Sequence, residues 1–256
     1  MPALLRKFRA LQLLLRTLGP LNTLRYKIQR LRMRVRAASR PLAYRVPGSP
    51  HPVWVRPGTS DMDVFHHTFV HQQYACLGEV ADPRLIIDGG ANAGYSAVWF
   101  LIRYPAAKVI AVEPDPANAD LLERNLKPYG GRATVVRSAL WSRPAGLVVR
   151  PGGDGRAWAW TVRESAPWET PDLTATEIGV LLAAAGEPRI SILKLRVEGA
   201  EEHIFGDADP AWLARTDAVV IELHNPDCRR AFMKAVAGHP FEVSEANDLT
   251  VCRRAA

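Results

Sequence analysis

The sequence predicts an α/β domain built on a mostly parallel sheet, and three observations carry that prediction. From about residue 85 onward, short apolar runs alternate with stretches of helical periodicity. A glycine-rich turn, Asp88-Gly89-Gly90-Ala91-Asn92-Ala93-Gly94-Tyr95-Ser96, directly follows the first apolar run, and Glu113 ends the next one. Because strands joined through helices make right-handed crossovers, alternation of this kind predicts neighbouring strands that run parallel.

The individual elements can be placed in order after a Pro-rich link at 41–57. Apolar spacing of three and four residues predicts helices at 61–78, 96–104, 116–127, 174–185, 200–205 and 227–237. Short apolar runs predict strands at 85–88, 108–112, 134–137, 147–150, 157–162, 190–195, 218–223, 241–244 and 249–253. The strands 147–150 and 157–162 flank the turn Pro151-Gly152-Gly153-Asp154-Gly155 and are expected to form a hairpin.

Charge divides the chain into a basic extension at 1–50 and a main domain at 51–256, for which the motifs described below predict catalysis. Residues 1–56 hold thirteen Lys or Arg and no acidic residue, whereas the remaining 200 residues hold 20 basic and 26 acidic groups. Apolar residues recur at helical spacing on both sides of Gly19-Pro20, at Leu4, Leu5, Phe8, Leu11, Leu15, Leu18, Leu21, Leu24, Ile28, Leu31 and Val35. Two basic amphipathic helices are therefore predicted.

These helices fit three partners that the sequence alone does not separate. Residues 1–40 suit peripheral contact with an anionic membrane surface, docking on the catalytic domain or another subunit, or nucleic acid, which we expect least. No uncharged stretch approaches the roughly 20 residues that a membrane span requires, and no cleavable signal is expected. Cys76, Cys228 and Cys252 lack metal-site or redox spacing and predict reduced thiols. We expect a cytoplasmic protein; if residues 1–40 contact a membrane, that contact is expected at its inner face.

The glycine turn predicts a nucleotide site. Gly90 and Gly94 are expected to let a ligand approach the backbone, and the N–H groups at the start of the helix are expected to serve as donors. The spacing matches neither the dinucleotide fingerprint nor the phosphate loop. A turn headed by Asp88 suits a cationic cofactor with an amino acid tail, namely S-adenosyl-L-methionine, and Glu113 is placed to accept hydrogen bonds from both ribose hydroxyls. The alternative is a tight turn and a surface Glu without a ligand.

Several ordered motifs resemble one known family. They are Arg56-Pro57-Gly58-Thr59-Ser60-Asp61, Ile87 to Ser96, Val112-Glu113-Pro114, Leu193 to Glu201, and Ile221-Glu222-Leu223-His224. Over roughly residues 52–253 the chain resembles the FkbM-type S-adenosylmethionine-dependent methyltransferases. The resemblance implies a class I methyltransferase (Rossmann-like) fold, with a seven-stranded, mostly parallel sheet and a reversed last strand. It also implies methyl transfer to a hydroxyl of a sugar, glycolipid or secondary metabolite.

With this resemblance, cofactor contacts are expected at the turn and at the ends of the second and third strands. The residues are Asp88, Gly90, Asn92, Gly94, Tyr95, Ser96, Glu113, Pro114, Ser138 and Ala139. Ligands of such sheets bind beyond the carboxyl ends of the strands, where the winding reverses.

The catalytic residues are expected at the ends of the later strands, namely Arg196, Glu198, Glu222 and His224. A positioned base adds a factor of about 10² to 10⁴ to transfer onto an alcohol. The ordinary pKa of His224 suits that role, and Glu222 would share its face of the strand. The alternative for His224 is a solvated loop histidine.

Arg196 departs from the family's pattern, Lys-x-Asp-x-Glu-Gly-x-Glu, at the aspartate. Arginine has no acceptor, so it cannot act as the base or as a metal ligand. On one strand, Lys194, Arg196 and Glu198 would project to one side, which predicts an Arg196–Glu198 pair. Three accounts stay open: Arg196 clamps an acidic substrate, the chain is a weak or inactive methyltransferase, or the residue was changed deliberately.

Two further clusters have competing interpretations. Trp158 and Trp160 would share one face of the hairpin, with Trp168 just beyond, either as a wall for a sugar ring or as core packing. His66, His67 and His71 have no identifiable further ligand, so we expect a helix surface and no metal.

Two rival functions also remain. A nucleic acid methyltransferase could use the basic extension, but the expected Asn or Asp followed by Pro-Pro and an aromatic is replaced by the segment 196–201. A cofactor-binding regulator without turnover is made plausible by Arg196.

Overall fold

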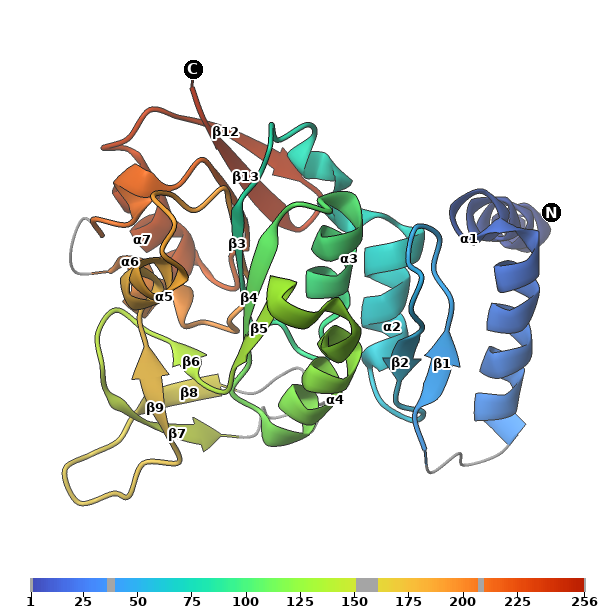
Figure 1. The fold of residues 1–256 in the computed structure, drawn as a ribbon, viewed down its shortest axis with the longest axis horizontal. Helices are drawn as coiled ribbons and strands as arrows, with labels where there is room; N and C mark the ends of the chain where they lie inside the picture. Colours follow the sequence, from blue (N-terminus) through green and yellow to red (C-terminus); the bar gives the residue numbers. More distant parts are fainter. Residues whose placement is uncertain (1, 36–39, 151–160, 207–209, 256) are drawn as a thin grey trace. The chain divides into compact units, whose positions relative to one another are not determined.

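The structure is a computed structural model that describes residues 2–35, 40–150, 161–206 and 210–255 (Figure 1). The chain forms two compact units, Met1–Ala75 and Cys76–Ala256. The units divide after residue 75, whereas the sequence pattern places the start of the catalytic domain at residue 51. Residues 51–75 pack with the N-terminal unit because their strand and helices complete its core.

The N-terminal unit begins with α1 (Pro2–Val35), which is broken at Gly19. Gly19 has a φ of 77°, so the two predicted helices are separated where Gly19-Pro20 predicts the break. The second half of α1 places Tyr26 against a small hairpin and a helix. Its ring lies 6.2 Å from the ring of Tyr44 and 6.5 Å from that of Phe65, and all three side chains are buried.

The Pro-rich link contains the one hairpin that the pattern misses in this unit. Strands β1 (Leu42–Tyr44) and β2 (Val53–Val55) pair antiparallel. The predicted helix at 61–78 is divided into α2 (Asp61–Phe65), the π-helical η1 (His66–Val70) and the 3-10 helix η2 (Gln73–Leu77). Short strands between prolines give too few residues for a clear alternation, so the sequence pattern predicts no strand there.

The C-terminal unit is built on the predicted seven-stranded sheet. Its strands are β3 (Leu85–Gly89), β4 (Lys108–Val112), β5 (Ala133–Val136), β10 (Ile192–Leu195), β11 (Ala218–Glu222), β12 (Phe241–Ala246) and β13 (Leu249–Arg254). Their order is β12-β13-β11-β10-β3-β4-β5. Strands β5, β4, β3, β10 and β11 pair parallel, and β13 runs antiparallel to both of its neighbours. The mostly parallel sheet with a reversed last strand is confirmed.

Helices cover both faces of this sheet (Figure 1). The helices α3 (Tyr95–Arg103) and α4 (Pro116–Leu126) lie on one face, and α5 (Ile178–Ala185), α6 (Glu201–Phe205) and α7 (Pro226–Val236) lie on the other. Two 3-10 helices, η3 (Lys127–Arg132) and η4 (Leu213–Arg215), precede β5 and β11. Asp115 and Asn225 cap α4 and α7, and each helix begins with a proline, which suits the first helical position.

A second, four-stranded sheet follows β5. It contains β6 (Ala139–Leu140), β7 (Gly146–Arg150), β8 (Thr161–Glu164) and β9 (Leu173–Thr176) in the order β6-β9-β7-β8. The antiparallel pairing of β7 with β8 confirms the predicted hairpin, while its turn, Trp158 and Trp160 lie outside the described residues. The helix expected from residue 174 begins at Ile178, because Leu173–Thr176 instead pairs with both β6 and β7.

Strand β3 is the point where the winding of the large sheet reverses. The chain passes from β3 to β4 and β5 on one side, and later to β10 and β11 on the other. Crevices form beyond the carboxyl ends of strands at such a reversal. The turn after β3, Glu113 after β4 and the segment after β10 therefore meet at one edge of the sheet.

Candidate functional site

Asp88 lies beneath the glycine turn as a buried ion pair. It is the register partner of Lys194 on the neighbouring strand β10, and Lys194 Nζ lies 2.8 Å from Asp88 Oδ1. Ser96 Oγ donates to Asp88 Oδ2 at 2.6 Å. Lys194 Nζ also donates to the carbonyl oxygen of Gly90 at 2.9 Å. Asp88 and Ser96 were expected to contact the cofactor, and in the structure both hold the turn from below.

The glycines of the turn are required by the protein's own packing. Gly90 has a φ of 68°, and a Cβ there would lie 1.8 Å from the carbonyl oxygen of Arg196. Gly94 has a φ of 88°, and a Cβ there would lie 2.6 Å from a methyl carbon of Leu122. At these two positions an added side chain would therefore collide with the segment that follows β10 or with α4.

The turn's backbone N–H groups also have partners within the protein. Ala91 donates to Val112 O, Asn92 donates to Glu113 Oε2 at 2.7 Å, and Gly94 donates to Ala91 O. Asn92 itself has a φ of 50° and is half-buried. These three N–H groups of the turn are therefore used to shape it, and one of their acceptors is a carboxylate.

That carboxylate belongs to Glu113, which follows β4. Its Oε1 accepts from Asp115 N at 3.0 Å and from Asn118 Nδ2 at 3.3 Å, and its Oε2 accepts from Asn92 N. The residue is 5% exposed, and burial raises the pKa of Glu113 to about 7 against the lowering effect of these hydrogen bonds. A carboxylate can accept about four hydrogen bonds. These three donors leave capacity for a hydroxyl, which is what a ribose offers.

The other residues expected at the cofactor differ in how deeply they are buried. Tyr95 is buried at the start of α3, Pro114 is half-buried beside Glu113, and Ala139 is buried in β6. Ser138 Oγ donates to Thr174 O at 2.5 Å, which ties the end of β5 to the small sheet. Pro114 is the one of these four that lies partly open beside the Glu113 carboxylate.

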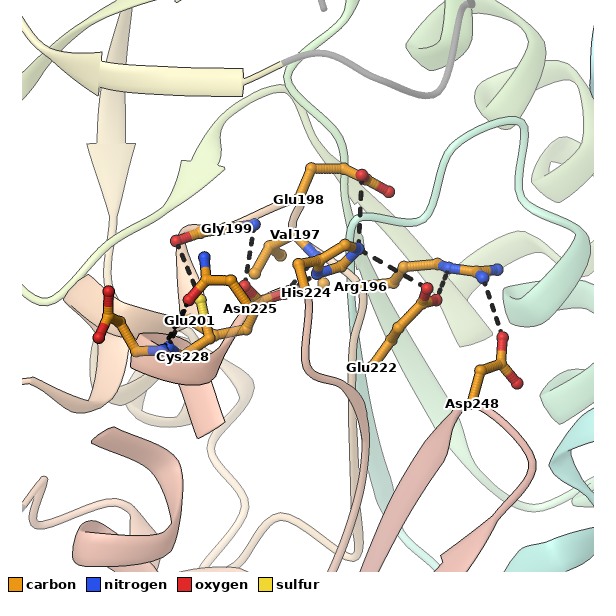
Figure 2. A network of polar contacts seen from close by, with 12 residues as sticks. Arg196, Val197, Glu198, Gly199, Glu201, Glu222, His224, Asn225, Cys228 and Asp248 are labelled. Carbon is orange, nitrogen blue, oxygen red and sulfur yellow. Dashed lines mark hydrogen bonds and ion pairs between the residues drawn. The ribbon is translucent and has the colours of Figure 1, made fainter. Parts of the chain in front are cut away.

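A second polar cluster lies beyond the ends of β10 and β11 (Figure 2). Arg196 Nε makes a short contact with Glu222 Oε2, and Arg196 Nη2 lies 3.4 Å from Asp248 Oδ2. The expected Arg196–Glu198 pair is replaced by these two, and Glu198 instead approaches His224. The alternation along β10 ends at Leu195, and Glu198 has a φ of 50°, so its side chain leaves the strand's face.

His224 lies between three carboxylates (Figure 2). Its Nδ1 is 2.8 Å from Glu201 Oε1, and its Nε2 is 3.4 Å from Glu198 Oε2 and 3.8 Å from Glu222 Oε1. Burial would lower its pKa, but the hydrogen bonds and charges of Glu198 and Glu201 raise the pKa of His224 to about 10. The imidazole is therefore protonated at neutral pH, unlike the free base that its ordinary pKa predicts.

Glu201 fixes this histidine and was not expected at the site. It is fully buried, and its Oε2 accepts from Gly199 N at 2.9 Å. Burial opposes its ionisation, but the hydrogen bond and charge of His224 lower the pKa of Glu201 overall. Glu201 could have been expected at the site from the sequence, because it is the last acidic residue of the Lys194 to Glu201 motif. Asn118 and Asp248 had no comparable signal in the sequence, because neither belongs to one of the motifs. Each comes close to the site residues only when the chain is folded.

The histidines at 66–71 and the cysteines are the other polar residues that the sequence singles out. His67 lies in η1 and His71 directly follows it, and the centroids of their rings are 5.8 Å apart. Within the ranges described, three or more His, Cys, Asp or Glu never gather as a metal ligand set. Cys76, Cys228 and Cys252 form no disulfide bond with one another within the described part of the chain.

Comparisons with known proteins identify the family. The model of the methyltransferase FkbM domain matches residues 88–238, which spans the glycine turn, Glu113 and the cluster around His224. The methyltransferase sdnD of Sordaria araneosa is 25% identical over 205 residues, which are 68% of this chain and 78% of that protein. The 2-O-methyltransferase NoeI of Sinorhizobium fredii is 35% identical over 97 residues, which are 38% of this chain and 39% of that protein.

Solved structures are similar at low sequence identity. A SAM-dependent O-methyltransferase from Thermotoga maritima has a TM-score of 0.43 and 14% identity, and the match covers 84% of this chain and 78% of that one. A putative RNA methyltransferase from Pyrococcus horikoshii has a TM-score of 0.41 and 16% identity, with coverage of 78% and 85%. The family match covers more than half of the chain and coincides with the strand ends described above. The chain belongs to the FkbM methyltransferase family.

Proposed function

We propose that the protein transfers a methyl group from S-adenosylmethionine to a hydroxyl of a sugar, glycolipid or secondary metabolite. The observation that carries the proposal is the buried carboxylate of Glu113, which retains hydrogen-bonding capacity at the edge where the sheet's winding reverses. A second polar cluster, around His224, lies at the ends of β10 and β11 on the other side of β3. A cofactor side and an acceptor side are thus both available at one edge.

S-adenosylmethionine is the methyl donor of this family, and as a sulfonium it supplies an activated methyl group. Glu113 would accept a hydrogen bond from a ribose hydroxyl, with Pro114 and Asn92 beside it. Asp88, Lys194 and Ser96 would keep the turn in place from below. Holding donor and acceptor in line is the largest contribution that such a site can make, worth about 7 to 11 kcal/mol.

The acceptor side would orient a hydroxyl and take up its proton. In the arrangement described, His224 carries a proton between Glu198 and Glu201, so it is suited to donating a hydrogen bond to the acceptor oxygen. Glu198 is partly exposed and ion-paired with His224, and its carboxylate would receive the proton that leaves the hydroxyl as the new C–O bond forms. His224 would serve as a base only after losing the proton that Glu198 and Glu201 together stabilise.

Arg196 is better suited to ordering the site than to clamping an acidic substrate. Its guanidinium already contacts Glu222 and Asp248, and an anionic acceptor would have to compete with both. We therefore expect an uncharged hydroxyl beside this cluster. A sugar hydroxyl fits this requirement, and the exposed Trp168 beyond the hairpin offers an aromatic face for a sugar ring. A lipid-linked acceptor would bring the reaction to a membrane surface, for which the basic residues 1–40 are suited.

The experiment is a methyl-transfer assay with radiolabelled S-adenosylmethionine and extracts of bacterial glycans and lipids, using the wild type, Glu198→Gln and Arg196→Asp. We expect label in an alkali-stable ether with the wild type and a loss of at least tenfold with Glu198→Gln. Cofactor binding without any transfer would favour a regulator that has lost turnover. A large gain with Arg196→Asp would assign that loss to the arginine.

A further inference from the structure

The second half of α1 exposes a row of large apolar side chains. Leu21 is 60% exposed, Leu24 57%, Ile28 42% and Leu31 62%. Exposed apolar residues are ordinary when they are scattered, but these four recur at spacings of three and four residues, which places them on one face of the helix. We call Leu21, Leu24, Ile28 and Leu31 the apolar stripe of α1.

The stripe faces away from the packing of its own unit. A residue advances about 100° around a helix, so the stripe spans about 80° and is centred opposite Tyr26. Tyr26 is buried against Tyr44 and Phe65, and Gln29 Nε2 donates to Ala43 O. The helix is therefore held to the hairpin by one face, which leaves the opposite apolar face uncovered by its own unit.

Charge indicates what covers the stripe. Measured around the helix from Tyr26, the stripe is centred at about 180°, and the exposed side chains of Lys27 and Arg25 lie at about 100° and 260°, one at each border of the stripe. The unit that carries the stripe holds thirteen Lys or Arg and only two acidic residues, and one of these, Asp61, is buried in an ion pair with Arg56. Basic borders beside an apolar face are the pattern of helices that lie in the interface of an anionic bilayer.

A second copy of the same surface is a poorer match. Two stripes packed together would bring their basic borders close to one another, and like charges at short range repel.

No helix of the described residues is both long and apolar enough to cross a membrane, so the contact would be one along the surface.

We propose that the apolar stripe of α1, with Arg25 and Lys27 at its borders, is a docking surface for an anionic phospholipid bilayer. The stripe enters the interface, and the two basic side chains remain at the level of the lipid phosphates. The proposal is independent of the acceptor and of methyl transfer, because it rests on residues of the N-terminal unit alone.

The test is flotation of the full-length chain with vesicles of phosphatidylcholine containing phosphatidylglycerol, and with vesicles of phosphatidylcholine alone. The wild type is expected to float with the anionic vesicles and much less with the neutral ones, and added salt is expected to weaken the binding. The double variant Leu24→Gln with Leu31→Gln keeps the charge and the helix propensity, and should partition about tenfold or more weakly. Arg25→Gln and Lys27→Gln should each weaken binding about fivefold.

The matched control is Val180→Gln, which changes an equally exposed apolar residue of the C-terminal unit. It is expected to float like the wild type, and circular dichroism of each variant verifies that its helices are retained. The proposal is overturned if the wild type floats with neither vesicle, or if Leu24→Gln with Leu31→Gln floats like Val180→Gln. A dimer in light scattering that the double variant dissociates, without vesicle binding, would assign the stripe to a second copy instead. Loss of methyl transfer with flotation retained would concern the proposed function only.

Discussion

Lys194 and Asp88 face each other across strands β10 and β3, with 2.8 Å between Nζ and Oδ1 and almost no exposure of either side chain. Lys194 also donates to the carbonyl oxygens of Gly89 and Gly90, so one ammonium group joins the last residues of β3 to the turn that follows. The ion pair therefore fixes the glycine turn to the two central strands of the sheet. Removing one partner would leave the other charged and buried.

Replacing Lys194 by methionine should consequently destabilise the protein by about 3 to 5 kcal/mol, the usual cost of breaking a buried ion pair. Urea unfolding measures this loss. Because the cost comes from the uncompensated carboxylate, Lys194→Met combined with Asp88→Asn should be more stable than Lys194→Met alone. Equal stability of wild type and Lys194→Met would mean that the pair does not hold the turn.

Gly90→Ala tests the close approach of the turn to β10. The new methyl group would meet the carbonyl oxygen of Arg196 at 1.8 Å, and the φ of 68° is unfavourable for any residue with a Cβ. We expect a lower melting temperature and at least tenfold weaker binding of S-adenosylhomocysteine. Gly131→Ala is the matched control, because its Cβ would meet nothing within 4 Å. Its unfolding free energy should stay within about 0.5 kcal/mol of the wild type, and an equal loss in both variants would count against the proposed packing.

The large sheet could be predicted from the sequence because its strands are short apolar runs, and helical patterns follow the runs of β3, β4, β10 and β11. The turn at Gly90 and the carboxylate of Glu113 follow from the same order, since parallel strands bring their carboxyl ends to one edge. The boundary near residue 174 was wrong, because the Leu173–Thr176 strand is contiguous with an apolar helix and periodicity over so few residues does not separate them.

The site's pairings were less predictable than its residues. Arg196, Glu198, Glu222 and His224 do lie together, as their positions at strand ends predict. Their partners depend on Asp248, which lies 52 residues after Arg196, and on the backbone at Glu198, which turns its side chain toward His224. Neither feature leaves a periodic signal in the sequence. The charge state of His224 follows from those pairings and so could not be predicted either.

The raised pKa of Glu113 predicts a pH dependence of cofactor binding. Burial raises this pKa to about 7, and the ionised carboxylate is the form that accepts hydrogen bonds from ribose hydroxyls. The affinity for S-adenosylhomocysteine should therefore fall as the pH falls through about 7, by up to about tenfold per pH unit. Titration calorimetry at several pH values measures this. Glu113→Gln should bind weakly at every pH, and a slope that persists in this variant would assign the titration to another group.

His224 predicts a pH dependence of stability with a defined sign. Its pKa is raised to about 10 in the folded protein, so the folded state binds more protons than the unfolded state above pH 6.5 or so. The stabilisation from its ion pairs is complete below that pH and is lost as the pH rises toward 10. The difference in unfolding free energy between wild type and His224→Gln should shrink over this window. A difference that is constant or increases would show that the histidine is neutral.

The most direct measurement is titration calorimetry of S-adenosylhomocysteine into the full-length wild type and into Glu113→Ala at pH 8. The account predicts saturable binding at one site in the wild type and a loss of at least tenfold in the variant, because a buried carboxylate that receives the ribose is removed. Absence of any binding to the folded wild type, or equal affinity in both proteins, would contradict the placement of the methyl donor at this edge of the sheet.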